Sequence, residues 1–168
     1  MRPRLILDGY NVIKALEELR IKEDISLEAG RQALINRMTA YKSSHPGVDV
    51  TVVFDAAGAP DSGWGTEQTK IRNLKIIFDR KCADSRIKKI VETSSNPRAI
   101  TVVSGDKGIT VYARGLGAKI LSPAELFQRL KTSNRAGKEQ AVKTDKPLPG
   151  TARAREIDQE LKQMWGIN

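Results

Sequence analysis

The sequence predicts an α/β fold, a three-layer α/β/α sandwich in which helices cover both faces of a mostly parallel sheet. Three observations lead to this prediction. Short apolar runs alternate with stretches of helical spacing along the first 131 residues of the 168-residue chain. The runs are rich in β-branched residues and almost wholly apolar, which is typical of strands buried on both faces of a parallel sheet. Hydrophobic residues make up 39% of the chain and charged residues 29%, a composition that supports a packed core.

The chain opens with a strand and two helices. Residues 4–7 form a short apolar run, which a turn at Asp8 ends. Helical spacing follows over residues 12–19. A stronger helical pattern covers residues 27–41, with apolar side chains on one face and Ser26 placed to cap the first turn.

The middle of the chain supplies two more strands with an irregular segment before the second. Residues 50–54 read VTVVF, an apolar run that Asp55 closes. Residues 56–69 hold three glycines, a proline and a tryptophan without periodicity. Because this stretch is long for a connection, we expect it to be a functional flap. Residues 74–78 then predict a third strand.

The remaining elements continue the same alternation. They are a helix over residues 83–91, a strand over 100–103, a short helix over 109–113 and a strand over 119–121. Ser122 and Pro123 are a good N-cap and first-turn pair for a last helix over residues 124–130. The domain is therefore expected to span residues 1–131. Residues 132–168 are expected to be a basic polar linker followed by a C-terminal helix.

Composition excludes several classes of site. The one cysteine, Cys82, cannot form an internal disulfide, and the one histidine, His45, argues against histidine-based catalysis. The apolar runs are far shorter than the roughly 20 residues that cross a bilayer, so we expect no membrane span. The N-terminus has no secretory signal pattern, and we expect a cytoplasmic protein. Any active groups must then come mostly from Asp, Glu, Lys, Arg, Ser and Asn.

Positive charge is concentrated in two blocks of a chain whose net charge is +9. Residues 70–90 hold eight Lys or Arg against two acidic residues, and residues 129–168 hold nine against five. A polyanionic partner is expected, and nucleic acid is the commonest one. The alternative on charge alone is an ordinary soluble basic surface. The candidate phosphate contacts of the first block are Lys70, Arg72, Arg80, Lys81 and Arg86.

Aspartates follow the predicted strands at the edge where ligands bind in such sheets. Asp8, Asp55 and Asp106 come at or just after strand ends, and Asp84 opens a helix that begins at the same edge. Carboxylates about 5 Å apart repel one another by roughly 3 kcal/mol per pair at an effective dielectric constant of about 20. A divalent cation offsets this repulsion, and oxygen ligands without Cys or His suit Mg²⁺ or Mn²⁺. The sequence therefore predicts a metal-dependent site acting on phosphodiesters.

Each acidic residue also has an ordinary structural interpretation, as a turn, cap or helix-dipole residue. Asp79 directly follows a strand, so strand-end geometry alone does not choose between Asp79 and Asp84 as the fourth acid. Asn11 and Ser104 are placed to bind phosphate or to hold an aspartate, or simply to cap.

Four segments make the sequence recognisable. They are DGYNVI at residues 8–13, VVFDA at 52–56, ADSRI at 83–87 and VVSGD at 102–106. In order and spacing these segments resemble the YacP-like branch of the NYN-domain ribonucleases, within the wider PIN-like nuclease group. The resemblance covers about residues 3–131. One departure is Cys82, where the family pattern suggests a small hydroxyl residue.

The resemblance implies a PIN-like sandwich and a ribonuclease, expected to be an endonuclease, that cleaves single-stranded RNA with Mg²⁺ or Mn²⁺. It implies that Asp8, Asp55, Asp84 and Asp106 are catalytic, with Asn11 and Ser104 binding substrate beside them. Asp8, Asp84 and Asp106 are the expected metal ligands, and the AD motif favours Asp84 over Asp79. One branch of the family is tied to the translating ribosome, which suggests ribosome-bound mRNA as a partner.

Two functions from other classes compete with this one. A phospho-acceptor receiver domain needs an acidic pair after its first strand and a Lys after its last, which this chain lacks. A catalytically inactive RNA-binding or ribosome-associated module is the stronger alternative, since it would keep the fold and the basic surface. Such a module would have little reason to keep four aspartates.

Overall fold

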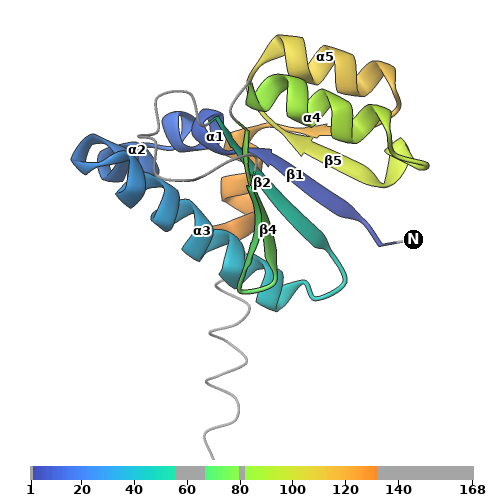
Figure 1. The fold of residues 1–168 in the computed structure, drawn as a ribbon. Coiled ribbons are helices and arrows are strands. Elements are labelled where there is room, and N and C mark those ends of the chain that lie inside the picture. Colours follow the sequence, from blue (N-terminus) through green and yellow to red (C-terminus); the bar gives the residue numbers. More distant parts are fainter. Residues whose placement is uncertain (1, 56–66, 80–81, 132–168) are drawn as a thin grey trace, which may run out of the picture. The chain divides into compact units, whose positions relative to one another are not determined.

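A six-stranded sheet forms the centre of the structure, a computed structural model that describes residues 2–55, 67–79 and 82–131 (Figure 1). The strand order is β3-β4-β2-β1-β5-β6. The strands are β1 Arg4–Asp8, β2 Asp49–Asp55, β3 Glu67–Ile71, β4 Leu74–Asp79, β5 Ile100–Val103 and β6 Lys119–Leu121. All neighbours pair in parallel except β3, which runs antiparallel to β4 at one edge. The predicted α/β class with a mostly parallel sheet is confirmed.

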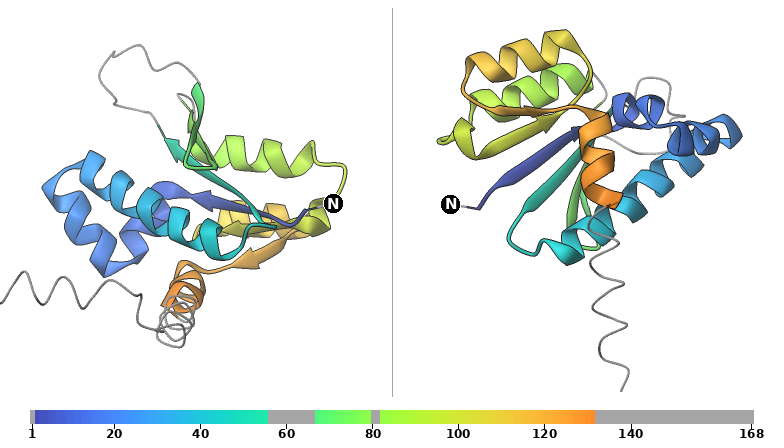
Figure 2. Two further views of the ribbon diagram at one scale, coloured as in Figure 1. Left: turned by 90° about the horizontal axis from the view of Figure 1, so that it is seen from below. Right: turned by 180° about the vertical axis from the view of Figure 1, so that it is seen from behind.

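Helices cover both faces of this sheet (Figure 2). They are α1 Gly9–Ala15, α2 Glu17–Ile25, α3 Leu27–Ser44, α4 Ala83–Glu92 and α5 Lys107–Gly115, with a 3₁₀ turn at Pro97–Ala99 and a helix over residues 123–131. The helices α1 to α3 and the helix over 123–131 lie on one face, and α4 and α5 on the other.

Strand alternation divides the apolar residues between two cores. In β1, Leu5 and Leu7 pack with the α1–α3 layer, whereas Ile6 packs with α4 and α5. In β2, Val53 joins Ile6 in that second core. Side chains two residues apart in a strand share a face. A residue two positions before or after Ile6 or Val53 in its strand therefore also faces α4 and α5.

Local sequence explains the ends of two helices. The Ser26 hydroxyl accepts a hydrogen bond from the Ala29 amide (3.0 Å) at the start of α3, as predicted. Ser122 and Glu125 form a reciprocal capping box before the helix over residues 123–131. The Glu125 amide donates to the Ser122 hydroxyl (3.2 Å), and the Ser122 amide donates to the Glu125 carboxylate (2.8 Å).

Two predicted elements are wrong in detail. The helix expected over residues 12–19 is two helices, because Leu16 adopts an extended conformation (φ −113°, ψ 111°) between α1 and α2. The stretch expected to be a flap over residues 56–69 ends in strand β3, which begins at Glu67. Residues 56–66 and the predicted linker and tail over 132–168 lie outside the described residues. Their assignment stays a prediction.

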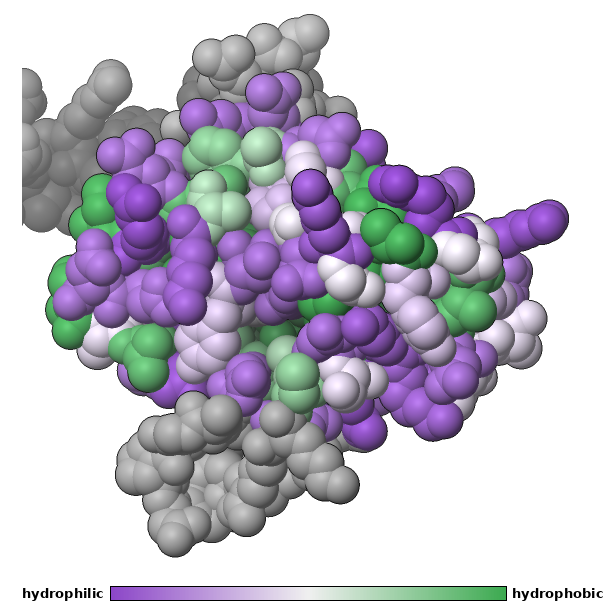
Figure 3. All heavy atoms as spheres, turned by 90° about the horizontal axis from the view of Figure 1, so that it is seen from above, coloured by the Kyte–Doolittle hydropathy of each residue, from purple (hydrophilic) through white to green (hydrophobic). Residues whose placement is uncertain are grey.

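One face of the described part of the chain is mainly polar. Figure 3 shows hydrophilic side chains over most of one face, with hydrophobic ones in small separate groups. Within the described ranges, no helix combines the length and apolar character that a membrane crossing needs.

Candidate active site

The predicted aspartates lie around one cavity at the carboxyl edge of the sheet. The cavity has a volume of about 310 Å³. Its lining includes Asp8, Asp55, Asp84 and Asp106 together with Asn11, Tyr10 and Lys14. Four separate elements of the chain supply the acids, so the fold brings together residues that are up to 98 positions apart.

Strand alternation explains why these side chains share a site. Asp8 lies two residues after Ile6, and Asp55 lies two residues after Val53. Both aspartates therefore face the α4 and α5 layer, as Ile6 and Val53 do. Asp84 is in the first turn of α4, and Asp106 is the N-cap of α5. The positive ends of these helix dipoles favour carboxylates at this edge.

Asp8 is held by two hydrogen bonds. Its Oδ1 accepts from the amide of Asn11 (3.4 Å) as the N-cap of α1, and its Oδ2 accepts from the hydroxyl of Ser104 (3.2 Å). Burial raises the pKa of Asp8 above its ordinary value, and the charges of Asp106 and Asp84 raise it further. The two hydrogen bonds oppose this change. The three carboxylates thus interact electrostatically through the cavity.

Asn11 and Ser104 connect the junction of β1 and α1, which carries Asp8, with the loop that carries Asp106. The Asn11 side-chain oxygen accepts from the Gly105 amide at 2.6 Å. The Ser104 hydroxyl, 2% exposed, accepts from the Asp106 amide at 3.0 Å while donating to Asp8. Asp106 in turn accepts from the amide of Ile109 at 3.1 Å. The network fixes where Asp8 and Asp106 stand relative to each other.

Lys88 neutralises part of the acidic charge. Its Nζ lies 2.9 Å from Asp84 Oδ1 and donates a hydrogen bond to Oδ2 (3.3 Å). The pKa of Lys88 is raised, chiefly by the hydrogen bond to Asp84, with further contributions from the charges of Asp84 and Asp106. The charges of Asp84 and Asp106 thus already stabilise one cation, the ammonium group of Lys88.

The donor set suits a hard divalent ion, although the acids are not gathered tightly. As placed, no three Asp, Glu, His or Cys side chains of the described ranges stand close enough to hold one ion. The buried Asp84 Oδ1 nevertheless has an ion pair but no hydrogen-bond donor among the described residues. This oxygen already faces one cation, the Lys88 ammonium group, and a divalent ion could take that place. Asp8, Asp84 and Asp106 offer only oxygen ligands, which Mg²⁺ and Mn²⁺ prefer.

The two candidates for the fourth acid have different surroundings. Asp84 lines the cavity, whereas Asp79 is not among its lining residues. Asp79 is 9% exposed; it accepts a hydrogen bond from the Cys82 amide (3.3 Å), and its Oδ2 lies 3.9 Å from Arg86 Nε. Asp79 is therefore engaged in shaping the start of α4, and Arg86 faces it rather than the cavity.

Other predicted substrate contacts lie elsewhere. Lys70 and Arg72 line a second cavity at the opposite edge of the sheet, and Arg80 and Lys81 lie outside the described residues. Sequence reasoning missed Tyr10 and Lys14, which line the acidic cavity, and Lys88. Helical spacing could have identified both lysines. Lys14 lies one turn after Asn11, and Lys88 lies one turn after Asp84.

Gly9 permits the close packing beneath the site. A Cβ at Gly9 would lie 2.4 Å from the Phe54 ring and 3.0 Å from the Val53 carbonyl oxygen. Only glycine allows α1 to begin this close to β2. In the first motif, Gly9 is therefore required for packing, whereas Asp8 before it belongs to the acidic cavity.

Comparison with known proteins points to one group. The family model of the YacP-like NYN domain matches residues 5–166, which extends well beyond the expected limit at residue 131. The protein YacP of Bacillus subtilis (strain 168) is 32% identical over 158 residues, covering 91% of each chain. A crystal structure of Rae1 (YacP) from Bacillus subtilis matches with a TM-score of 0.68 and 29% identity over 97% of this chain and 94% of that one. A mutant of the same protein matches with a TM-score of 0.69 and 28% identity over 89% of each chain.

Proposed function

This chain belongs to the YacP-like NYN domain family, whose members are generally nucleases, and we propose that it is a metal-dependent endoribonuclease. Its substrate would be single-stranded RNA, cut by hydrolysis of a phosphodiester bond. In its most specific form, the proposal is a cytoplasmic enzyme acting on mRNA in the setting of translation, including mRNA on the ribosome.

The observation that carries the proposal is the convergence of four aspartates on one cavity. Asp8, Asp55, Asp84 and Asp106 reach it from the ends of two strands and the starts of two helices. Caps and turns alone do not require that such residues share a cavity. The raised pKa of Asp8 reflects this crowding as well as burial. A cation would offset the repulsion.

Each group has a distinct task in this proposal. Asp8, Asp84 and Asp106 would hold Mg²⁺ or Mn²⁺, which would supply positive charge beside the scissile phosphate and activate a water for in-line attack. Asp55 stands on the same cavity wall, where it can accept a proton from the attacking water. Asn11 and Ser104 keep Asp8 and the loop of Asp106 in place.

The cationic side chains at the cavity suit a phosphate substrate. Lys14 is an exposed residue of its lining, and Lys88 lies against Asp84. If Asp84 held a metal ion in place of the ammonium group, Lys88 would be available to contact a phosphate oxygen. Tyr10 adds a partly buried ring to the same wall, where it can pack against a base.

A second candidate function is a catalytically inactive RNA-binding module. The separation of the acids favours it, because the described residues contain no ready group of three ligands. The ion pair between Lys88 and Asp84 also favours it, since it already neutralises one acid.

Cleavage of a labelled single-stranded RNA distinguishes the two functions. The full chain is incubated with the RNA in Mn²⁺ and, separately, in chelator, beside Asp84→Asn and the control Asp24→Asn. Asp24 is an exposed acid of α2 that does not line the acidic cavity. We expect cleavage by wild type and by Asp24→Asn in Mn²⁺ only, and strongly reduced cleavage by Asp84→Asn. RNA binding without cleavage by wild type in Mn²⁺ or Mg²⁺ would favour the inactive module.

A further inference from the structure

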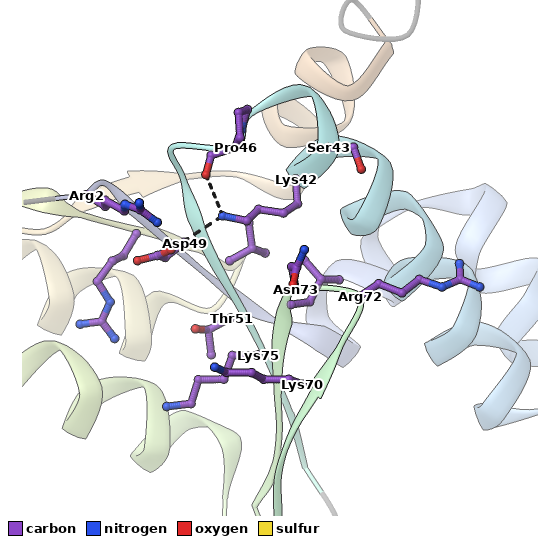
Figure 4. A pocket seen from close by; sticks show the side chains of 13 residues that line it. Arg2, Lys42, Ser43, Pro46, Asp49, Thr51, Lys70, Arg72, Asn73 and Lys75 are labelled. Carbon is purple, nitrogen blue, oxygen red and sulfur yellow. Dashed lines mark hydrogen bonds and ion pairs between the residues drawn. The ribbon is translucent and has the colours of Figure 1, made fainter.

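A second cavity lies at the amino edge of the sheet, where β1, β2 and β4 begin (Figure 4). It has a volume of about 650 Å³. Its lining holds one carboxylate, Asp49, and six cationic residues, Arg2, Arg4, Lys42, Lys70, Arg72 and Lys75. No aromatic residue is among the lining residues. We call this the basic cavity.

Strand register places part of this charge in a row across the sheet. Lys70 of β3 pairs directly with Lys75 of β4, and Lys75 pairs in parallel with Thr51 of β2. Directly paired residues point to the same face, so the two lysines and the hydroxyl stand side by side. Like charges directly opposite each other across two strands are destabilising. A bound anion would convert this repulsion into attraction.

Most of the cations have no hydrogen-bond or ion-pair partner among the described residues. Lys42 is engaged, because its Nζ donates to the carbonyl oxygens of Pro46 (3.1 Å) and Val48 and lies 3.7 Å from Asp49. That contact also neutralises Asp49. Within the described part of the chain, no hydrogen bond or ion pair involves the side chains of Arg2, Arg4, Lys70 or Lys75. Arg72 extends away from the others in Figure 4 and is not needed for the site.

We propose that the basic cavity binds backbone phosphates of RNA at a distance from the cleavage site. The unpaired Lys and Arg side chains and the Thr51 hydroxyl, on a side chain that is 5% exposed, are donors that suit phosphate oxygens. Without an aromatic lining, the cavity offers no platform for stacking bases, so binding is independent of sequence.

The position along β2 relates this site to the acidic one. Thr51 and Asp55 are four residues apart on the same face, which corresponds to about 13 Å at about 3.3 Å per residue. Val53 lies buried between them, so an RNA strand that contacts both sites would pass around the protein surface, along a path longer than this distance. The inference rests on the proposed function for the choice of RNA as ligand, but the phosphate site itself does not require cleavage.

The test measures binding without chemistry. Labelled single-stranded RNA is titrated in chelator with the full-length wild type, with Lys70→Gln/Lys75→Gln, and with Arg114→Gln/Lys119→Gln. The last variant makes the same charge change at exposed residues that line neither cavity. We expect the first variant to bind about tenfold more weakly, and its slope of log affinity against log salt to fall by about 1.4, since each contact contributes about 0.7. The control should stay within about twofold of wild type.

Folding and specificity are checked in the same series. Removing two opposed lysines should leave the melting temperature unchanged or higher, which shows that weaker binding is not unfolding. Wild-type affinity in Lys70→Gln/Lys75→Gln overturns the inference, and so does an equal loss in both variants. Polyglutamate of matched charge is titrated as well. If the lysine pair controls its binding and not that of RNA, the partner is an acidic protein and the inference is wrong. If wild type fails to cleave in Mn²⁺ while RNA binding still depends on the lysine pair, the proposed function fails and this inference stands.

Discussion

The two ends of the same sheet face carry opposite charge. At the carboxyl edge, Asp8 and Asp55 lie two residues beyond Ile6 and Val53 of the second core. At the amino edge, Arg4 and Thr51 lie two residues before that same pair, and Lys75 lies in the same row as Thr51. Because the strands other than β3 are parallel, their carboxyl ends meet at one edge and their amino ends at the other. The strand direction thus separates a site for acids from a site for cations.

Helix ends reinforce the separation. Helices α1, α4 and α5 begin at the acidic edge, with Asp8 and Asp106 as N-caps and Asp84 in a first turn. Helix α3 ends beside the basic cavity, where Lys42 donates to carbonyl oxygens just beyond its last turn. Partial positive charge at helix starts stabilises the acids, and partial negative charge at helix ends stabilises the cations.

The two edges also differ in rigidity, which suits different tasks. Hydrogen bonds of Asn11 and Ser104 fix the acidic side chains, as a reaction geometry requires. Lys70 and Lys75 of the basic cavity, by contrast, are point charges on flexible stems that make no hydrogen bond or ion pair with another described residue. The acidic edge is therefore suited to chemistry and the basic edge to attracting phosphate.

The largest expected effect tests the acidic edge. Asp8→Asn and Asp106→Asn should each lower the rate of RNA cleavage at saturating Mn²⁺ by at least about 100-fold, an electrostatic loss of roughly 3 kcal/mol in the barrier. Single-turnover kinetics on labelled RNA measure it. Asp24→Asn, at an exposed acid of α2 that lines neither cavity, is the matched control and should keep its rate. A folded Asp106→Asn protein with the wild-type rate would remove this residue from the site.

Metal binding should distinguish Asp84 from Asp79. An ion that binds only the native state stabilises it by about 2.7 kcal/mol at one hundred times its dissociation constant. Thermal melts in chelator and in Mn²⁺ should show this gain in wild type and in Asp79→Asn. Asp84→Asn should lose most of it. The opposite pattern would transfer the metal ligand to Asp79, whose carboxylate accepts from the Cys82 amide in this structure.

Packing beneath the acidic edge gives a somewhat smaller effect. Gly9→Ala should destabilise the protein by about 1 to 3 kcal/mol, because the added methyl group would overlap the Phe54 ring and force it to move. Urea denaturation measures the change. Gly47→Ala is the control, since a Cβ there meets nothing within 4 Å. Equal stability of the two variants would show that the start of α1 is not constrained by β2.

The smallest expected effect is a pH dependence from Asp8. The folded-state pKa of Asp8 is raised above its ordinary value of 3.8, so the folded protein holds this proton more tightly than the unfolded chain does. Stability of the metal-free protein should therefore fall as pH rises from the ordinary pKa to the folded one. Melting temperatures of wild type minus those of Asp8→Asn, measured in chelator against pH, isolate the effect. A difference that rises with pH over this window would contradict the raised pKa.

Much of the fold could be predicted because apolar periodicity reports burial. The runs at residues 4–7, 50–54 and 100–103 are covered on both faces, and all are strands. The break at Leu16 could not be predicted, because this buried residue continues the apolar spacing of α1 into α2. Strand β3 reads EQTKI and lies at the sheet edge, so it carries little of the apolar alternation that indicates a strand.

The site was predictable to the extent that it depends on strand ends. Strand order and direction bring Asp8 and Asp55 together, and the sequence pattern contains both. The sequence pattern could not show that the basic residues between 70 and 90 belong to two different edges of the sheet. Lys70 and Lys75 belong to the amino edge and Lys88 to the acidic edge, because the chain crosses the whole sheet along β4 between them. Net charge counts these residues together, whereas the fold separates them.

The central claim is that the acidic edge cleaves RNA and the basic edge binds it. The dependence of cleavage rate on RNA concentration in Mn²⁺ tests this claim most directly. Wild type, Asp106→Asn and Lys70→Gln/Lys75→Gln are compared on one labelled RNA. We expect Asp106→Asn mainly to lower kcat, whereas the lysine variant should mainly raise KM. If Asp106→Asn instead kept the wild-type kcat, or if wild type cleaved equally well in chelator, the assignment of metal-dependent cleavage to the acidic edge would be contradicted.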